Sequence, residues 1–197
     1  MAWDTAATRR KILDAAVEEF AEHGPTGTTV DRIAARAGVN KERIYNYFGN
    51  KQALFKKVLA HESERIAGSV VLDFSADDPI GDYAGRIFDY HVEHPELLRL
   101  LLWEGLTAPS DIAESRFAHY RAKTEMFAKA QRDGVIRDDL DPGALLFSIM
   151  ALAAWWHAAP HVARMTTGTD PANPADLAAR RAAVVEAARR LASPGDP

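Results

Sequence analysis

The stretch "NKERIYNYFGNK", residues 40–51, combines charges, an amide and aromatic rings within one helix-sized segment. Lys41, Arg43 and Lys51 are cations, Asn46 carries an amide, and two tyrosines and a phenylalanine stand between them. A solvated helix face favours the charges but not the rings, and a core helix favours the rings but not the charges. A helix that lies against DNA uses both, because polar groups contact phosphates and bases while the rings pack and offer hydroxyl tips.

The residues before this stretch predict a short helix and a tight turn. In "TTVDRIAARAGVN", residues 28–40, two threonines offer an N-cap, and Asp31 is placed for a capping box with Thr28. The helix is expected to end at Gly38, and Asn40 is the next N-cap. Two short helices joined by such a turn, the second carrying the polar cluster, are typical of a helix-turn-helix. The alternative is a plain helical bundle whose third helix is polar.

Apolar residues recur at helical spacing along almost the whole chain, and no segment shows a convincing strand alternation. The sequence therefore predicts an all-α fold. We expect a three-helix, helix-turn-helix head at residues 1–57, a fourth helix at about 51–67, and a helical body at 58–197. The other helices are expected at 8–23, 80–93, 95–106, 110–133, 142–162 and 174–192.

Charge is distributed unevenly between the two predicted parts. Residues 1–57 hold 10 Lys and Arg against 7 Asp and Glu, a net +3, whereas residues 58–197 hold 14 against 21, a net −7. A basic head on an acidic body indicates that the head meets a polyanion.

Cysteine is absent, which excludes disulfides and thiolate chemistry. The first residues show no signal peptide, and the longest apolar run, 144–159, is short of a membrane span, so we expect a cytoplasmic protein without a membrane partner.

The order of motifs resembles the N-terminal DNA-binding domain of TetR-family transcriptional regulators. The resemblance rests on "TRRKILDAAVEEFAEHG" (8–24) followed by "TTVDRIAARAGVNKERIYNYFGNKQALF" (28–55), and covers about residues 8–60 without gaps. It implies a double-stranded palindromic operator, a homodimer, and a helical body that binds a small-molecule effector and dimerises. The body itself resembles the family only in being all-helical. A cofactor or metal is not expected, although two pairs of histidines at helical spacing (91 and 94, 157 and 161) leave a metal as a minor alternative.

In the predicted head, residue chemistry and resemblance assign the same roles. The third helix would enter the major groove, where Lys41 and Arg43 donate to guanine, Asn46 bridges adenine, and Glu42 either accepts from cytosine or pairs with its basic neighbours. Four residues match family positions or chemistry suited to backbone phosphate: Thr29, Tyr45, Tyr47 and Lys51. For Tyr45 the alternative is simple packing.

In the predicted body, apolar helices and a surplus of aromatic residues suggest two kinds of surface. The resemblance implies a dimer interface made by the last two helices, through Leu145, Ile149, Leu152, Leu177, Val184, Ala188 and Leu191; the alternative is burial within one subunit. The candidates for an effector pocket are Phe88, His91, Trp103, Phe127, Phe147, Trp155 and Trp156; the alternative is an ordinary aromatic core.

These observations predict a dimeric repressor that a small apolar or aromatic ligand releases from DNA. A second hypothesis is a DNA-binding regulator whose body docks a protein partner. An all-helical enzyme is a third, and the sequence offers it no nucleophile–base arrangement, phosphate loop or cofactor motif.

Overall fold

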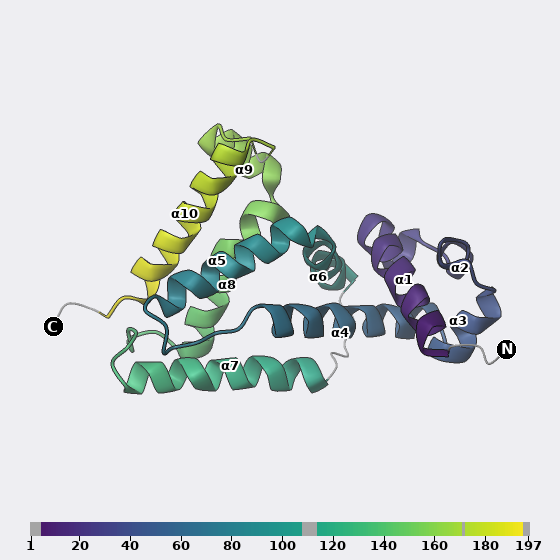
Figure 1. Ribbon diagram of the computed structural model, residues 1–197, viewed down its shortest axis with the longest axis horizontal. Coiled ribbons are helices and arrows are strands. Elements are labelled where there is room, and N and C mark those ends of the chain that lie inside the picture. The colour runs from purple at the N-terminus through teal and green to yellow at the C-terminus, as the bar shows by residue number, and fades with distance from the viewer. Residues whose placement is uncertain (1–4, 108–113, 171, 195–197) are drawn as a thin grey trace. The chain divides into compact units, whose positions relative to one another are not determined.

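The computed structural model describes residues 5–107, 114–170 and 172–194, and these residues form ten helices and no strand (Figure 1). This confirms the all-α prediction. The helices are α1 (Thr5–Gly27), α2 (Val30–Ala37), α3 (Lys41–Phe48), α4 (Lys51–Ser69), α5 (Pro79–Glu93), α6 (Pro95–Thr107), α7 (Glu114–Arg132), α8 (Pro142–Ala158), α9 (Pro160–Thr167) and α10 (Pro174–Ala192). The predicted start of a helix at residue 110 falls outside the described residues.

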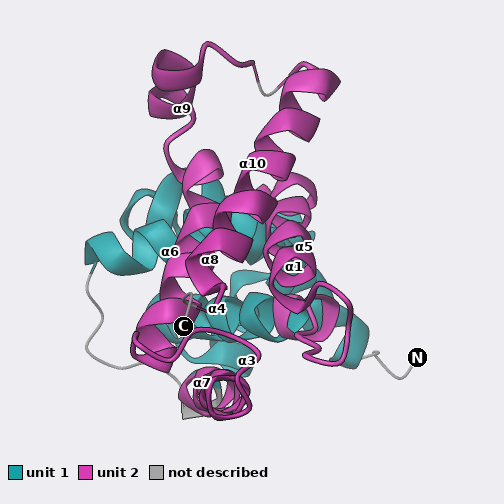
Figure 2. Cartoon of the chain, turned by 90° about the vertical axis from the view of Figure 1, so that its left-hand side faces the viewer, with its two compact units in different colours: residues 1–65, 96–116 teal, residues 66–95, 117–197 magenta. Residues whose placement is uncertain are grey.

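The chain divides into two compact units, coloured separately in Figure 2. Unit 1 comprises residues 1–65 and 96–116, and unit 2 comprises residues 66–95 and 117–197. The division differs from the boundary expected at residue 57, because α6 packs with the N-terminal helices. Leu100 of α6 is fully buried in the same apolar core as Ile12, Phe20 and Ile44.

A break in α1 makes room for α6 within unit 1. Gly24 has φ 72° and ψ 169°, a backbone conformation open to glycine, and Pro25 follows it. A Cβ added at Gly24 would lie 2.8 Å from the ring of Trp103 on α6. Trp103 Nε1 also donates a long hydrogen bond, 3.4 Å, to the carbonyl oxygen of Ala21. Gly24, which directly follows the helix predicted at 8–23, therefore lets an aromatic ring approach the backbone.

Unit 2 is built around α5, α8 and α10, which pack on one another and bury its core. The helix predicted at 142–162 is instead two helices, α8 and α9, bent by 90°. Pro160 is the cause, since proline has no N–H to continue the hydrogen-bond ladder and its ring clashes with the preceding turn. Residues 157 and 161 therefore do not share a helical face, as the predicted single helix required.

Among the described residues, length and composition allow no single helix to cross a membrane. Only α8 and α9 taken together pass that test, and they are bent at their junction.

Candidate functional site

The helix α3 has one buried and one exposed face. Ile44 is fully buried and Phe48 nearly so, and both belong to the core that α1, α2 and α4 share. The opposite face is exposed and carries Lys41, Glu42, Tyr45 and Asn46, with Arg43 and Tyr47 partly buried at its edges. Tyr45 is 48 % exposed. Ile44 and Phe48 thus anchor the helix in the core, and Tyr45 joins the polar residues on the exposed face.

Local capping fixes the turn between α2 and α3. Thr29 is the N-cap of α2, and its hydroxyl accepts a hydrogen bond from the Arg32 N–H at 3.2 Å. Gly38 ends α2 in the left-handed conformation, with φ 64°. Asn40 caps α3, and its side-chain oxygen accepts from the Glu42 N–H at 3.3 Å. The predicted end at Gly38 and the predicted cap at Asn40 are confirmed.

The predicted capping box at Thr28 is wrong. The Thr28 hydroxyl donates instead to Oε2 of Glu19 on α1, at 2.7 Å, so it serves the packing of α1 and not the start of α2. Glu19 is itself 3 % exposed, which is unusual for a carboxylate.

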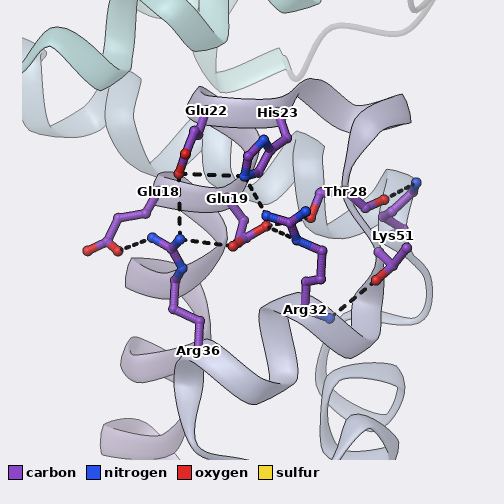
Figure 3. A network of polar contacts seen from close by, with 9 residues as sticks. Glu18, Glu19, Glu22, His23, Thr28, Arg32, Arg36 and Lys51 are labelled. Atoms are coloured by element: carbon purple, nitrogen blue, oxygen red, sulfur yellow. Dashed lines mark hydrogen bonds and ion pairs between the residues drawn. The ribbon is translucent and has the colours of Figure 1, made fainter.

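Two arginines of α2 complete a polar network around Glu19 (Figure 3). Arg32 Nε lies 3.0 Å from Glu19 Oε2, and Arg36 Nη2 lies 3.0 Å from Glu19 Oε1. Arg36 also reaches Glu18 at 2.6 Å. Burial raises the pKa of Glu19, but hydrogen bonds from Thr28 and Arg32 and the charges of both arginines outweigh it, so the pKa lies below its ordinary value. The carboxylate is therefore ionised and holds α2 against α1.

Lys51 ties a third element to this network. Its Nζ donates to the Thr28 carbonyl oxygen at 2.8 Å, which joins the start of α4 to the segment before α2 (Figure 3). An ammonium group has two further protons, so this bond leaves donors for a phosphate. Lys41 is also engaged: its Nζ lies 3.2 Å from Asp31 Oδ1 on α2. This hydrogen bond and the negative charge of Asp31 raise the pKa of Lys41.

The seven residues predicted at a dimer interface divide into two groups. Leu145, Ile149, Val184 and Ala188 are buried inside unit 2, between α5, α8 and α10. Such side chains present no surface to a second copy, so this part of the prediction is corrected. The other three, Leu152, Leu177 and Leu191, are partly exposed.

The seven residues predicted to line an effector pocket do not form one set. Phe88, His91 and Phe127 are buried in unit 2, and Trp156 is partly buried there. Trp103 belongs to unit 1, where it packs on α1. Phe147 and Trp155 lie on the surface of α8 and are 71 % and 63 % exposed. Apolar residues occur all round α8, so the sequence did not indicate which of its faces is covered.

Unit 2 holds buried and partly buried polar groups that the sequence analysis did not identify. Arg180 of α10 is 4 % exposed; it donates to the hydroxyl and carbonyl oxygens of Thr169 and lies 5.4 Å from the Trp156 ring. Lys123 of α7 donates to the hydroxyl of the buried Tyr83 at 3.0 Å. Burial lowers the pKa of Lys123 to about 8 and raises that of Tyr83. Their only sequence signal was polarity within helices that must pack.

Two histidines lie near each other in the interior of unit 2. The rings of His91 on α5 and His157 on α8 are 6.1 Å apart, and Phe88 lies 4.7 Å from His157. Burial, with a smaller effect of His157, lowers the pKa of His91 to about 4. Burial and the charge of Arg180 also lower the pKa of His157. Within the described part of the chain, no group of three or more His, Asp or Glu side chains could hold a metal ion.

Known proteins resemble this chain along most of its length. Residues 12–58 match the family model described as bacterial regulatory proteins, tetR family, and residues 79–190 match the tetracyclin repressor-like C-terminal domain. The chain is 42% identical over 191 residues to the HTH-type transcriptional repressor SCO4008 of Streptomyces coelicolor, which covers 95% of this chain and 96% of that protein. The C-terminal match falls on the region that the sequence motifs left uncovered.

Solved structures show the same fold. The crystal structure of SCO4942 from Streptomyces coelicolor matches with a TM-score of 0.80 and 36% identity, covering 94% of this chain and 98% of that one. AibR, solved in complex with isovaleryl coenzyme A and operator DNA, matches with a TM-score of 0.68 over 91% of this chain and 97% of its own. Its identity of 17% limits the likeness to the fold. The names and families are those of transcriptional regulators and not of enzymes, and this chain belongs to the TetR family of bacterial transcriptional regulators.

Proposed function

We propose that the chain is a dimeric repressor that reads a palindromic DNA operator with α3 and leaves it when a small molecule binds unit 2. The observation that supports this best is that α3 is amphipathic, with one buried face and one exposed face. Buried Ile44 and Phe48 fix the helix, and its opposite face presents polar side chains to solvent. A helix of this kind fits the major groove, where such groups distinguish base pairs.

Within this proposal the exposed face of α3 and its edges carry the base-reading residues and two of the phosphate-contacting residues. Asn46 bridges adenine, Arg43 and Lys41 donate to guanine, and Glu42 accepts from cytosine. The phosphate contacts come from Thr29, Tyr45, Tyr47 and Lys51. The pairing of Lys41 with Asp31 supports a more limited role for Lys41, since reading a base requires it to leave that partner.

A second copy is needed because one short helix reads too few bases for useful specificity. The exposed rings of Phe147 and Trp155, on the face of α8 that unit 2 leaves uncovered, support a dimer surface there. The partly exposed Leu152 belongs to the same proposed surface. This assignment transfers to the interface two aromatic residues that the sequence suggested for ligand binding.

Regulation by a small molecule requires that the molecule bind two conformations of the repressor unequally. The relative SCO4008 is named a repressor, and AibR shows that this fold accommodates a small molecule and operator DNA in one complex. The helix α4 runs from residue 51 in unit 1 to residue 69 in unit 2, so it joins the DNA-reading helix to the proposed ligand-binding unit. A coupling of about 1–3 kcal/mol is typical of allosteric proteins.

The test is to select an operator from random DNA and to measure the affinity of point variants for it and for its single-base mutants. Arg43→Ala or Asn46→Ala should cost about 1–3 kcal/mol and remove the preference at particular bases. Lys57→Ala, which removes an exposed cation of α4 in the same unit, is the control and should leave the base preference intact. An unchanged preference in both α3 variants would refute the reading role.

A further inference from the structure

Two buried imidazole nitrogens in unit 2 lack a hydrogen-bond partner among the described residues. They are Nδ1 of His91 on α5 and Nε2 of His157 on α8. His91 is 4 % exposed, and the two ring centroids are 6.1 Å apart. Native proteins leave few buried polar atoms unpaired, since each forfeits its hydrogen bonds to water. Two such atoms on facing helices therefore mark a place where another molecule can supply the missing partners.

The charge around the pair selects the kind of molecule. Burial keeps both imidazoles neutral near pH 7, because it lowers both pKa values. A neutral imidazole carries one N–H donor and one acceptor nitrogen. The guanidinium of Arg180, held by Thr169, acts on His157 from α10. A positive charge at this depth disfavours a cationic ligand and favours an electron-rich oxygen.

The surroundings of the pair are aromatic. The ring of Phe88 lies 4.7 Å from that of His157. Phe88 also lines a solvent-open groove of about 260 Å³ between α5 and α10, whose other lining residues are apolar (Val92, Pro174, Leu177 and Ala178) or charged (Asp89, Glu93 and Arg181). Phe88 thus packs on the His157 ring and also borders the groove. Apolar walls with a few placed polar groups are the usual form of a small-molecule site.

We propose that unit 2 binds a phenol, whose hydroxyl lies between His91 Nδ1 and His157 Nε2 and whose ring lies against Phe88. One hydroxyl can donate to one imidazole and accept from the other, so it satisfies both nitrogens. With two hydrogen bonds of about 2.8 Å along directions about 110° apart, its oxygen would bridge nitrogens about 4.6 Å apart, a spacing open to rings whose centroids are 6.1 Å apart. This inference rests on the proposed ligand-responsive function and names the chemical class of its ligand.

The experiment is calorimetry of the full chain with three matched probes: 2-naphthol, its methyl ether 2-methoxynaphthalene, and the cation 2-naphthylmethylammonium. We expect 2-naphthol to bind at least about tenfold more tightly than the ether, since the ether cannot donate and so leaves one nitrogen unpaired. The cation should bind more weakly still.

Variants of the two histidines test whether the preference for the hydroxyl arises at this pair. His91→Phe and His157→Phe should each reduce the advantage of the hydroxyl to less than about threefold, because one of the two hydrogen bonds is lost. The control is His161→Phe, which replaces an exposed histidine of α9 and should leave the advantage of the hydroxyl unchanged. Circular dichroism reports whether each variant folds. If the phenylalanine variants do not, His91→Gln and His157→Gln keep a polar side chain and serve in their place.

Four results would overturn the proposal: equal affinity for 2-naphthol and its ether, no binding of 2-naphthol, an unchanged hydroxyl preference in folded variants, or a crystal structure in which only water bridges the two histidines. Operator affinity is measured separately with the same probes. A hydroxyl-dependent site that leaves operator affinity unchanged would support the phenol site and refute ligand-released repression. If a molecule without a hydroxyl releases the operator and 2-naphthol binds no more tightly than its ether, the result would support ligand-released repression and refute the phenol site.

Discussion

Glu19 of α1 and Arg32 of α2 form an ion pair, with Oε2 and Nε 3.0 Å apart, although the Glu19 side chain is almost entirely buried. Thr28 and Arg36 bind the same carboxylate, so one side chain joins α1, the segment that follows it and α2. Because α2 and α3 are linked by a turn of few residues, this carboxylate also limits where α3 can lie.

Replacing Glu19 with glutamine should destabilise unit 1. The amide cannot accept as many hydrogen bonds as the carboxylate and leaves the two arginines without their shared counterion. A loss of about 1–3 kcal/mol in the free energy of unfolding is expected. Urea denaturation followed by circular dichroism measures it, and Asp14→Asn, at an exposed residue of the same helix, is the control. Equal stability of the two variants would contradict the role assigned to Glu19.

The same pair predicts how stability depends on pH. The pKa of Glu19 is lowered in the folded state, so its stabilising contribution is complete above the ordinary value for a glutamate and is lost as the pH falls through the lowered folded value. The difference in stability between the wild type and Glu19→Gln should therefore be constant from about pH 7 to about pH 5.5 and should shrink below about pH 4.5. Comparison with the variant isolates the contribution of Glu19. A difference that grew on acidification would refute the assignment.

Two glycines with positive φ offer a matched test of the contact between α1 and α6. Gly24→Ala should cost about 2–4 kcal/mol, because the new Cβ meets the Trp103 ring at 2.8 Å and the backbone conformation is strained for alanine. Gly38→Ala meets nothing within 4 Å, so only backbone strain, about 1–2 kcal/mol, applies. In a Trp103→Leu background the cost of Gly24→Ala should fall toward that of Gly38→Ala. An unchanged cost there would show that the ring is not the obstacle.

The pairing of Lys41 with Asp31 predicts a gain of DNA affinity on mutation. Asp31→Asn removes the carboxylate that holds Lys41 and one negative charge from the proposed DNA-binding surface. Binding to random-sequence DNA should tighten, and the slope of log affinity against log salt should steepen by up to about 1. Asp14→Asn changes the net charge equally at an exposed residue of α1 and is the control. If both variants bind alike, Lys41 is not restrained by its partner.

From the exposed face of α8 we predict which glutamate substitutions will disrupt the proposed dimer. Phe147→Glu and Trp155→Glu should yield folded monomers, because these rings are exposed in the single chain and a carboxylate there opposes burial against a second copy. Ile149→Glu should instead unfold unit 2, since Ile149 is fully buried. Light scattering gives the mass and circular dichroism the fold. Val135→Glu, an exposed residue outside the helices, should remain dimeric. A dimeric Trp155→Glu would exclude this face.

The sequence by itself determined the helices and the turn of the head. The end at Gly38 and the cap at Asn40 depend on residues within about one helical turn. The break at Pro160 was also a local signal, which the apolar run around it concealed.

Only the tertiary structure decided which partners distant residues find. Thr28 looked like a cap and instead binds Glu19, nine residues earlier; Trp103 looked like part of a pocket and instead packs on Gly24. The apolar surface of α8 offered no preferred face, so its division into buried Ile149 and exposed Trp155 depended on where α5 and α10 pack. The physical reason is common to these cases: caps and periodicity act between neighbours in the chain, whereas burial is set by segments that the fold brings together.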